Sequence, residues 1–123
     1  MKNVVIIDDE EDSKIIYDMM FDDELESGQI KIKYFLSGID CMQWLSKINF
    51  NSVDAIITDI NMPEMNGVEL VREIRHNGFN GPVYFVSAYD PMTYQKVMAE
   101  LHIQDYFTKP IDFKYFRNSI LEK

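Results

Sequence analysis

The chain has 123 residues, of which 46% are hydrophobic and 13% aromatic, a composition that predicts a globular protein with a substantial core. Its formal net charge of -9, from 21 acidic residues against 12 lysines and arginines, argues against direct binding to nucleic acid. The apolar stretch Val4–Ile7 is too short for a signal peptide or a membrane span, and the single cysteine, Cys41, excludes an internal disulfide and a cysteine-based metal cluster.

These properties predict a cytoplasmic protein that makes no membrane contact and no direct nucleic-acid contact. The sequence contains no internal repeat, low-complexity tract or linker rich in proline, glycine and serine. We expect residues 1–123 to form a single domain with no output domain within the chain. Such a domain either stands alone or belongs to a longer protein.

The first predicted strand is the apolar run Val4–Ile7, which is typical of a central parallel strand covered on both faces. The acidic residues 8–12 follow, and then a helix whose predicted apolar stripe consists of Ile15, Ile16, Met19 and Met20. The acidic residues between 22 and 26 would oppose the macrodipole of that helix if it continued through them. We therefore expect the helix to end in a solvated acidic loop before Gly28.

Strict alternation of apolar and polar residues over Ile30–Tyr34 predicts a second strand at an edge of the sheet. Ser37 followed by Asp40 predicts the start of a second helix, with an apolar stripe of Ile39, Met42, Leu45 and Ile48 flanked by Cys41 and Trp44. A third strand, Ala55–Thr58, then ends at Asp59.

A third helix is predicted from about residue 67 to 75, with Val68, Val71 and Ile74 facing inward. The fourth strand is residues 83–86, and Ser87 lies at its carboxyl end. Asp90 and Pro91 then predict the start of a fourth helix that reaches about residue 101. The fifth strand is residues 103–108, and Asp112 caps a last helix with the stripe Phe113, Phe116 and Ile120.

Five strands alternating with five helices predict an α/β fold in which a doubly wound five-stranded parallel sheet carries helices on both faces. The alternating second strand belongs at an edge, which fits the strand order 2-1-3-4-5 of flavodoxin-like sheets.

Five polar residues follow the predicted strands: Asp8, Asp9, Asp59, Ser87 and Lys109. Because the strands are parallel, all five should lie at one edge of the sheet. Two carboxylates about 4 Å apart repel by roughly 4 kcal/mol at an effective dielectric near 20, so three carboxylates in one cluster need a cation.

The residue types around this edge favour Mg²⁺, with Mn²⁺ as an alternative, because the ligands are all oxygens and no histidine or cysteine is available for Zn²⁺. The backbone carbonyl of Asn61 could supply a further oxygen. A metal ion, Lys109 and the Ser87 hydroxyl around Asp59 are suited to a phosphoryl group carried by that carboxylate. Taken singly, the acids could cap helices and Lys109 could be an ordinary surface charge.

Four motifs, IIDDE at 6–10, DINMPEMNG at 59–67, FVSAY at 85–89 and DYFTKP at 105–110, resemble the response-regulator receiver domains of two-component signalling. The resemblance covers the whole chain. It implies that Asp59 accepts a phosphoryl group from a histidine kinase or phosphotransfer protein. It also implies that Asp9, Asp59 and the Asn61 carbonyl bind Mg²⁺ directly, with Asp8 acting through a water molecule.

The same resemblance implies that Ser87 and Lys109 bind the phosphoryl oxygens. As the Ser87 hydroxyl moves toward the phosphate, Tyr106 would rotate inward as the switch residue. The Lys109–Pro110 peptide bond would be cis, which is tolerated before proline. Asn61 and Tyr89, each two residues beyond a site residue, are expected to tune the lifetime of the phosphoryl group.

The sequence departs from the receiver pattern in three places. His102 stands where the fourth helix commonly ends in glycine, which predicts a positive φ at a histidine. Gln104 with Asp105, and Ser119, differ from the residues of receivers that dimerise in the winged-helix DNA-binding subfamily, and this argues against that dimer. The face formed by the fourth helix, fifth strand and fifth helix is still expected to expose aromatic residues and to bind a partner through them. These residues are Tyr89, Tyr94, Tyr106 and Tyr115.

Three alternative functions compete with this interpretation. A phosphatase of the haloacid-dehalogenase type would need an aspartate at position 61 as acid and base, where this chain has Asn61. A flavodoxin-like electron carrier would need a phosphate-binding loop after the first strand, where acids stand instead. A receiver-like domain could also bind another protein without being phosphorylated.

For the receiver function, we expect no enzymatic activity beyond Mg²⁺-dependent self-phosphorylation and self-dephosphorylation. We expect the phosphorylated domain to act on a downstream protein or an output domain outside the chain.

Overall fold

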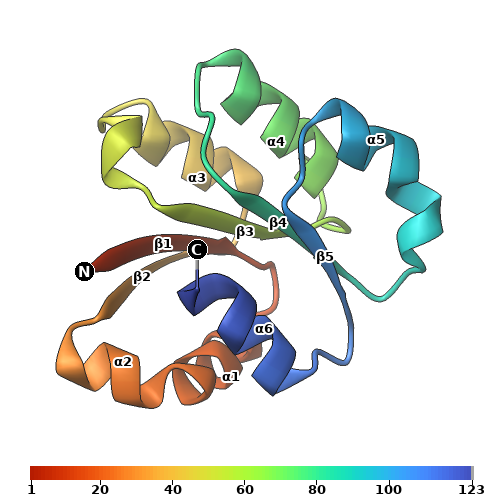
Figure 1. Ribbon diagram of the computed structural model, residues 1–123. Helices are drawn as coiled ribbons and strands as arrows, with labels where there is room; N and C mark the ends of the chain where they lie inside the picture. Colours follow the sequence, from red (N-terminus) through yellow and green to blue (C-terminus); the bar gives the residue numbers. More distant parts are fainter. Residues whose placement is uncertain (123) are drawn as a thin grey trace.

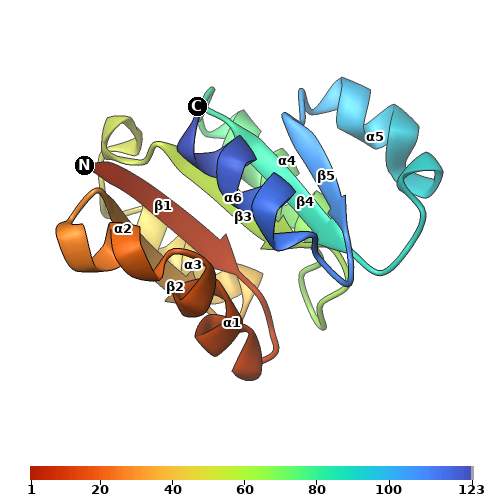
Figure 2. The ribbon, with the colours of Figure 1, turned by 60° about the horizontal axis from the view of Figure 1, so that its bottom comes forward.

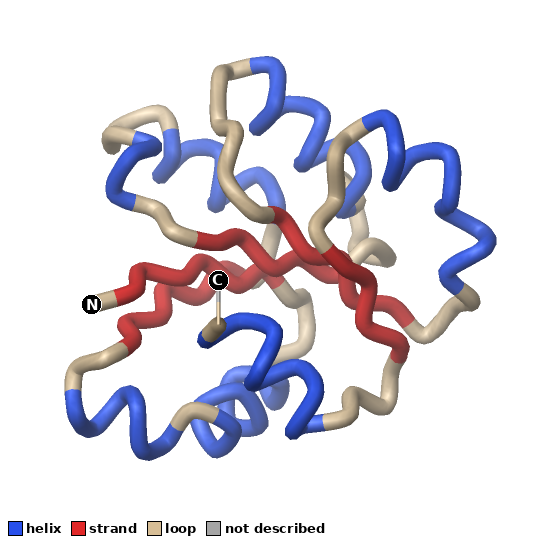
Figure 3. The backbone as a smooth tube through the Cα atoms, in the orientation of Figure 1, coloured by secondary structure: helices blue, strands red, loops and turns tan. Residues whose placement is uncertain are grey.

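A computed structural model describes residues 1–122 and shows a parallel β-sheet between two layers of helices (Figures 1 and 3). The strands are β1 (Lys2–Ile7), β2 (Ile30–Phe35), β3 (Ala55–Asp59), β4 (Val83–Ser87) and β5 (Asp105–Thr108). They are arranged in the order β2-β1-β3-β4-β5, and all four neighbouring pairs are parallel. The predicted doubly wound α/β fold and its strand order are therefore confirmed.

Six α-helices rather than the expected five lie within residues 1–122, together with two short 3-10 helices. Their bounds are α1 (Asp12–Met20), α2 (Asp22–Ser27), α3 (Gly38–Leu45), η1 (Phe50–Ser52), α4 (Gly67–His76), η2 (Pro91–Tyr94), α5 (Gln95–Glu100) and α6 (Phe113–Leu121). Helices α3, α4 and α5 cover one face of the sheet, and α1, α2 and α6 cover the other, which lies in front in Figure 2. No helix within residues 1–122 is both long enough and apolar enough to cross a membrane.

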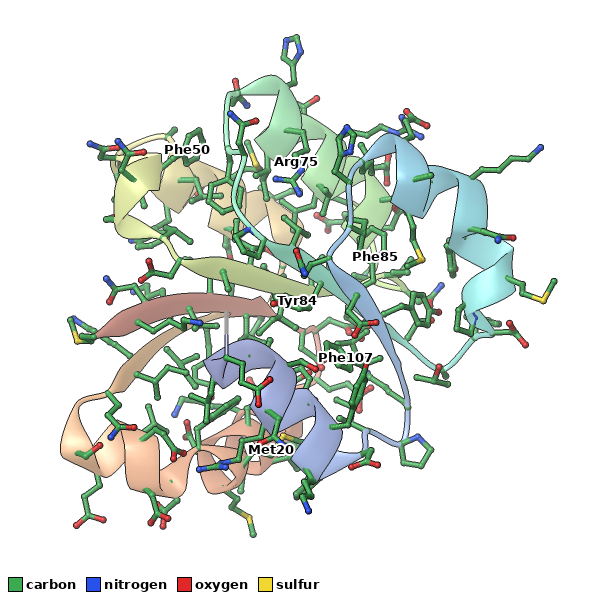
Figure 4. The ribbon with its side chains drawn as sticks, viewed as in Figure 1. Met20, Phe50, Arg75, Tyr84, Phe85 and Phe107 are labelled. Carbon is green, nitrogen blue, oxygen red and sulfur yellow. The ribbon has the colours of Figure 1, made fainter. Side chains whose placement is uncertain are left out.

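The sheet separates two apolar cores, because successive side chains of a strand point to opposite faces. In β1, Val5 and Ile7 pack into the core beneath α3, α4 and α5, whereas Val4 and Ile6 pack into the core beneath α1 and α6. Figure 4 shows Phe50 in the first of these layers and Met20 in the second. The continuous apolar runs of the central strands follow from burial on both faces. Strand β2, which pairs with β1, is an edge strand and carries the exposed residues Lys31 and Lys33.

The predicted apolar stripe of α1 is confirmed at Met20 and wrong at its other three positions. Ile15, Ile16 and Met19 are exposed, and the helix turns Tyr17 into the core beside Met20, together with Phe21, which follows it. Tyr17 and Phe21 both pack against Phe116 of α6, with ring centroids 5.6 and 5.9 Å apart. Burying two aromatic rings removes more apolar surface from water than burying the isoleucine pair, so the aromatic residues determine which face turns inward.

The predicted acidic loop at 22–26 is also wrong, because a separate helix, α2, begins at Asp22. Phe21 has a non-helical backbone, with φ -113° and ψ 23°, and its buried side chain ends the first helix. The acids that would oppose the end of α1 become the first turn of α2, where the helix dipole favours negative charge. Within this helix Glu24 is buried and forms an ion pair with Arg117 of α6.

Most helix starts agree with the sequence. The Ser37 hydroxyl accepts a hydrogen bond from the amide of Asp40 at 3.1 Å, and Asp112 caps α6 by accepting from the amide of Tyr115 at 3.1 Å. Five predicted stripe residues of these later helices are not buried: Ile39 and Phe113 are exposed, and Met42, Ile48 and Val68 are half-buried.

The predicted fourth helix is divided into η2 and α5, since Tyr94, the last residue of η2, has φ -114° and ψ 13°. Asp90 caps this segment as expected, accepting from the amide of Met92 at 2.9 Å. The fifth strand begins at Asp105, two residues later than predicted, because the amide of Ile103 still bonds to the carbonyl of Met98 at the end of α5. His102 has a φ of 55°, which confirms the positive φ expected from its position.

Candidate functional site

Three carboxylates meet where β1 and β3 end. One ligand oxygen from each of Asp8, Asp9 and Asp59 lies within 4.8 Å of the others. Asp59 is the last residue of β3 and is only 6% exposed, and Asp8 is equally buried directly after β1. Because β1 and β3 are adjacent and parallel, their carboxyl ends necessarily bring these acids to one edge of the sheet.

Lys109 brings a positive charge to this cluster. Its Nζ lies 3.0 Å from Oδ2 of Asp59, 3.7 Å from Oδ2 of Asp8 and 3.9 Å from Oε1 of Glu10. The backbone amide of Lys109 donates to the carbonyl of Ser87 at 2.8 Å, so β4 fixes the point from which the lysine reaches across. The Lys109–Pro110 peptide bond is cis, the isomer that the family resemblance implies.

Burial raises the pKa of Asp59, Lys109 opposes this rise, and the charges of Asp8 and Asp9 add to it, so that the pKa stays above its usual value. Burial alone would lower the pKa of Lys109, but Asp59, Asp8 and Glu10 together raise it. The lysine is therefore held in its charged form. A second positive charge at this cluster would return the pKa of Asp59 toward its usual range.

The turn behind Asp59 depends on Gly67. Its amide donates to the carbonyl of Ile60 at 2.8 Å, and a Cβ atom at this position would meet the carbonyl oxygen of Asp59 at 2.3 Å. Asn66 and Glu69 form a reciprocal capping box that begins α4 immediately beside this contact. A glycine is thus required for α4 to begin against the end of β3, which fixes the position of the Asp59 carboxylate.

The donor set fits a hard divalent cation. Oδ2 of Asp8 is buried and forms no hydrogen bond to any described residue, while its Oδ1 accepts from the amide of Glu10 at 2.9 Å. An unsatisfied buried carboxylate oxygen is costly unless a cation or water binds it. Together with Asp9 and Asp59 it offers oxygen ligands of the kind that Mg²⁺ prefers.

Ser87 at the end of β4 is fully buried. Its hydroxyl donates to Oδ1 of Asn61 at 2.9 Å and accepts from the amide of Tyr89 at 3.1 Å. Within residues 1–122 its hydrogen bonds therefore run to Asn61 and Tyr89 rather than to Asp59.

Tyr106 was expected among the exposed aromatic residues, and this is wrong, because it is 7% exposed. Its hydroxyl donates to the backbone carbonyl of Tyr89 at 2.8 Å, and its ring stacks on Tyr94 with centroids 6.2 Å apart. Tyr89 and Tyr115 are exposed, as expected, and Tyr94 is half-buried. Tyr89 thus contacts Ser87 and Tyr106 through its backbone, while its side chain points to the surface.

Two contacts of the site were missed by sequence reasoning. Glu10 reaches Lys109, a contact that the acidic run after β1 could have suggested. The hydroxyl of Tyr94 accepts a hydrogen bond from Nδ2 of Asn61 at 3.4 Å, and no pattern in the sequence links two residues 33 positions apart.

The chain matches the family model described as the response regulator receiver domain over residues 4–121. It is 35% identical over 112 residues to the transcriptional regulatory protein HptR of Staphylococcus aureus (strain NCTC 8325 / PS 47), a match that covers 91% of this chain and 42% of that protein. The chain thus spans less than half the length of this relative.

Solved structures show the same fold. The response regulatory domain of protein mrkE from Klebsiella pneumoniae has a TM-score of 0.81 at 26% identity, covering 98% of this chain and 93% of that one. The chemotaxis protein CheY4 of Vibrio cholerae has a TM-score of 0.82 at 18% identity, covering 99% and 98%. On the family match and the fold, this chain belongs to the response regulator receiver domains of two-component signalling.

Proposed function

We propose that this receiver domain accepts a phosphoryl group on Asp59 from a histidine kinase or phosphotransfer protein, in a reaction that depends on Mg²⁺. The observation that carries the proposal is the buried carboxylate of Asp59, with the Lys109 ammonium at 3.0 Å and two further carboxylates within 4.8 Å. Phosphoryl transfer depends mainly on positioning and on neutralising charge on the transferring oxygens, and this arrangement supplies groups for both.

The transfer step would exchange one phosphorus bond for another. A carboxylate oxygen of Asp59 forms a bond to phosphorus while the P–N bond of the phosphohistidine breaks, and the electron pair of that bond stays on the imidazole nitrogen. Lys109 would neutralise one phosphoryl oxygen, and the Ser87 hydroxyl would donate to another after leaving Asn61. Asp59 acts as the nucleophile in its ionised form, which Lys109 favours.

Asp9, Asp59 and the backbone carbonyl of Asn61 would hold the Mg²⁺ ion directly, and Asp8 would hold it through a water molecule. When bound, the ion neutralises charge on the carboxylates and on the transferring oxygens. Mn²⁺, which takes the same oxygen ligands, would substitute for it.

The proposed output face consists of η2, α5, β5 and α6, where a change of charge at Asp59 would alter the binding of a partner. Exposed Met92 and Tyr115 belong to this face, and exposed Tyr89 lies in the loop that leads into η2. Aromatic residues and methionine are enriched at protein interfaces. The partner would be a downstream protein or an output domain outside this chain. The relative HptR is named a transcriptional regulatory protein, so a transcriptional output is one candidate for the longer protein.

Asn61 and Tyr89 are proposed to set the lifetime of the phosphoryl group. Both side chains are exposed at the rim of the site, on the side from which water would attack the aspartyl phosphate. Hydrolysis of its own phosphoryl group, and phosphorylation from a small phosphodonor, would be the only reactions of a domain that otherwise signals in the cytoplasm.

Intact-mass analysis after incubation with acetyl phosphate and Mg²⁺ tests the proposal. We expect the mass of one phosphoryl group to be added to the wild-type domain, and to be absent both from Asp59→Asn and from wild type treated with EDTA. Addition that persists in Asp59→Asn would assign the modification to another residue. No addition, in protein shown separately to bind Mg²⁺, would favour a contact domain that works without phosphorylation.

A further inference from the structure

Five residues between Asp59 and the output face form a closed ring of contacts, called the ring below: Ser87, Asn61, Tyr94, Tyr106 and Tyr89. The Ser87 hydroxyl donates to Asn61 at 2.9 Å, and Asn61 donates to the Tyr94 hydroxyl at 3.4 Å. Tyr94 stacks on Tyr106, whose hydroxyl donates to the carbonyl of Tyr89 at 2.8 Å. The amide of Tyr89 donates back to the Ser87 oxygen at 3.1 Å.

The Ser87 hydroxyl carries a single proton, so it donates one strong hydrogen bond at a time. That proton is directed at Oδ1 of Asn61. If Ser87 is to donate to a phosphoryl oxygen on Asp59, the bond to Asn61 must break. Asn61 and the phosphoryl group therefore compete for the same proton, and the loss of this bond leaves the Asn61 carboxamide free to reorient.

We propose that Asn61 and Tyr94 act as positioning residues that carry the phosphorylation state of Asp59 to the output face. Without a phosphoryl group, Asn61 holds both the Ser87 hydroxyl and the Tyr94 hydroxyl. After phosphorylation, the Ser87 hydroxyl donates to the phosphoryl group instead of to Asn61. The Asn61 side chain then reorients, and its hydrogen bond to the Tyr94 hydroxyl is lost. This inference rests on the proposed phosphorylation of Asp59.

Tyr94 is better placed than Tyr106 to respond. Tyr106 is already buried, and its hydroxyl is held by the backbone carbonyl of Tyr89 at 2.8 Å. Tyr94 is half-buried and is held by a bond of 3.4 Å, which is long and therefore weak. It also lies at the junction between η2 and α5, where the backbone leaves helical geometry.

The far end of α5 is fixed, which would confine a response to its beginning. The guanidinium of Arg75, labelled on α4 in Figure 4, donates to the carbonyls of Leu101 at 2.9 Å and His102 at 3.1 Å. Arg72 and Glu100 add an ion pair between α4 and the last turn of α5. With this end anchored, release of Tyr94 would move η2 rather than the whole helix.

Fluorine NMR of protein labelled with 3-fluorotyrosine tests the path, because the fluorine beside the hydroxyl reports on its hydrogen bonding. The chain has seven tyrosines, and the Tyr94 signal is assigned as the one missing from Tyr94→Phe. We expect phosphorylation by acetyl phosphate and Mg²⁺ to shift this signal in wild type. In Asn61→Ala, which keeps the backbone carbonyl, the signal should already be displaced before phosphorylation and should move little afterwards.

Binding of beryllofluoride, a phosphoryl analogue that does not undergo the hydrolysis of an aspartyl phosphate, tests the competition at equilibrium. Removing the competing acceptor in Asn61→Ala should tighten its binding by about two- to tenfold, the equivalent of one net hydrogen bond. Tyr115→Phe is the matched control, because it removes a tyrosine hydroxyl on the same face that contacts Asp105 and lies outside the ring. Its affinity should stay within about twofold of wild type.

Intact mass measured on each NMR sample separates the two proposals. Wild-type protein that gains no phosphoryl mass would overturn the phosphoacceptor function and the ring mechanism with it. Protein that gains the mass while the Tyr94 signal stays in place, or shifts equally in Asn61→Ala, would overturn the ring mechanism alone. So would beryllofluoride binding to Asn61→Ala that is unchanged or weaker.

Discussion

The buried carboxylate of Glu24 in α2 is paired with the guanidinium of Arg117 in α6, across 93 residues of sequence. The pair joins two helices that lie on the same face of the sheet as α1 (Figure 2). Oε1 of Glu24 has no hydrogen-bond partner among the described residues, so Arg117 provides the main compensation for burying this charge.

Replacing Arg117 by methionine should therefore destabilise the domain by about 2 kcal/mol. This value lies below the range for fully buried pairs because the Arg117 side chain is 37% exposed. Urea unfolding monitored by circular dichroism measures the change. Arg72→Met is the matched control, since its pair with Glu100 is exposed on both sides and should contribute less than about 1 kcal/mol. Equal losses in the two variants would contradict the prediction.

Replacing Lys109 by methionine should slow phosphorylation from acetyl phosphate by about 100-fold or more, the usual effect of removing a group that stabilises charge in the transition state. The rate of mass addition at fixed Mg²⁺ concentration provides the measurement. Lys114→Met, at an exposed position of α6, controls for the loss of one positive charge. A Lys109 variant that reacts at the rate of this control would exclude the lysine from the reaction.

Replacing Gly67 by alanine should destabilise the domain by about 3 kcal/mol or more and abolish phosphorylation, because the new Cβ would lie 2.3 Å from the carbonyl oxygen of Asp59. Gly78→Ala provides a steric control. Gly78 has a φ of 101°, and among residues 1–122 no atom beyond the glycine and its chain neighbours lies within 4 Å of the position that a Cβ would take there, so alanine brings backbone strain of about 1–2 kcal/mol without a clash. Urea unfolding measures the loss of stability in each variant, and intact mass measures phosphorylation. The two variants together compare the clash at Gly67 with the backbone strain at Gly78.

Mg²⁺ should stabilise the folded domain, because three carboxylates within 4.8 Å of one another exist only after folding. At a concentration about 100 times the dissociation constant, the gain would be about 2.7 kcal/mol. Thermal unfolding with added MgCl₂ measures it, with NaCl at equal ionic strength as control. Asp9→Asn should reduce the difference, and an equal stabilisation by both salts would show that the ion acts only through screening.

Asp59→Asn should be more stable than wild type at pH 7 without Mg²⁺. The pKa of Asp59 is raised in the folded state, so its ionisation at neutral pH opposes folding. As the pH falls through the folded pKa, the wild-type carboxylate takes up a proton, and the advantage of the variant should disappear toward the unfolded value of about 3.9. Free energies of unfolding across this range check the sign, which would be reversed if Asp59 stabilised the fold as an anion.

Sequence patterns were sufficient for the sheet. Apolar runs such as Val4–Ile7 and the alternation of Ile30–Tyr34 distinguish central from edge strands, because a strand alternates its side chains between two faces whatever it packs against. The position of Asp59 at the carboxyl end of a strand followed from the same pattern, and parallel strands necessarily bring their carboxyl ends to one edge. Those features depend on local periodicity and chain topology.

Only the tertiary structure decided which faces of the helices turn inward and which hydrogen bonds the site forms. Tyr17 and Phe21 displaced the isoleucines of α1 because Phe116, almost 100 residues later in the chain, offers them a packing surface. The break at Phe21 and the contact between Asn61 and Tyr94 arise in the same way. Contacts between distant residues depend on shape and burial in the assembled core, which local periodicity does not encode.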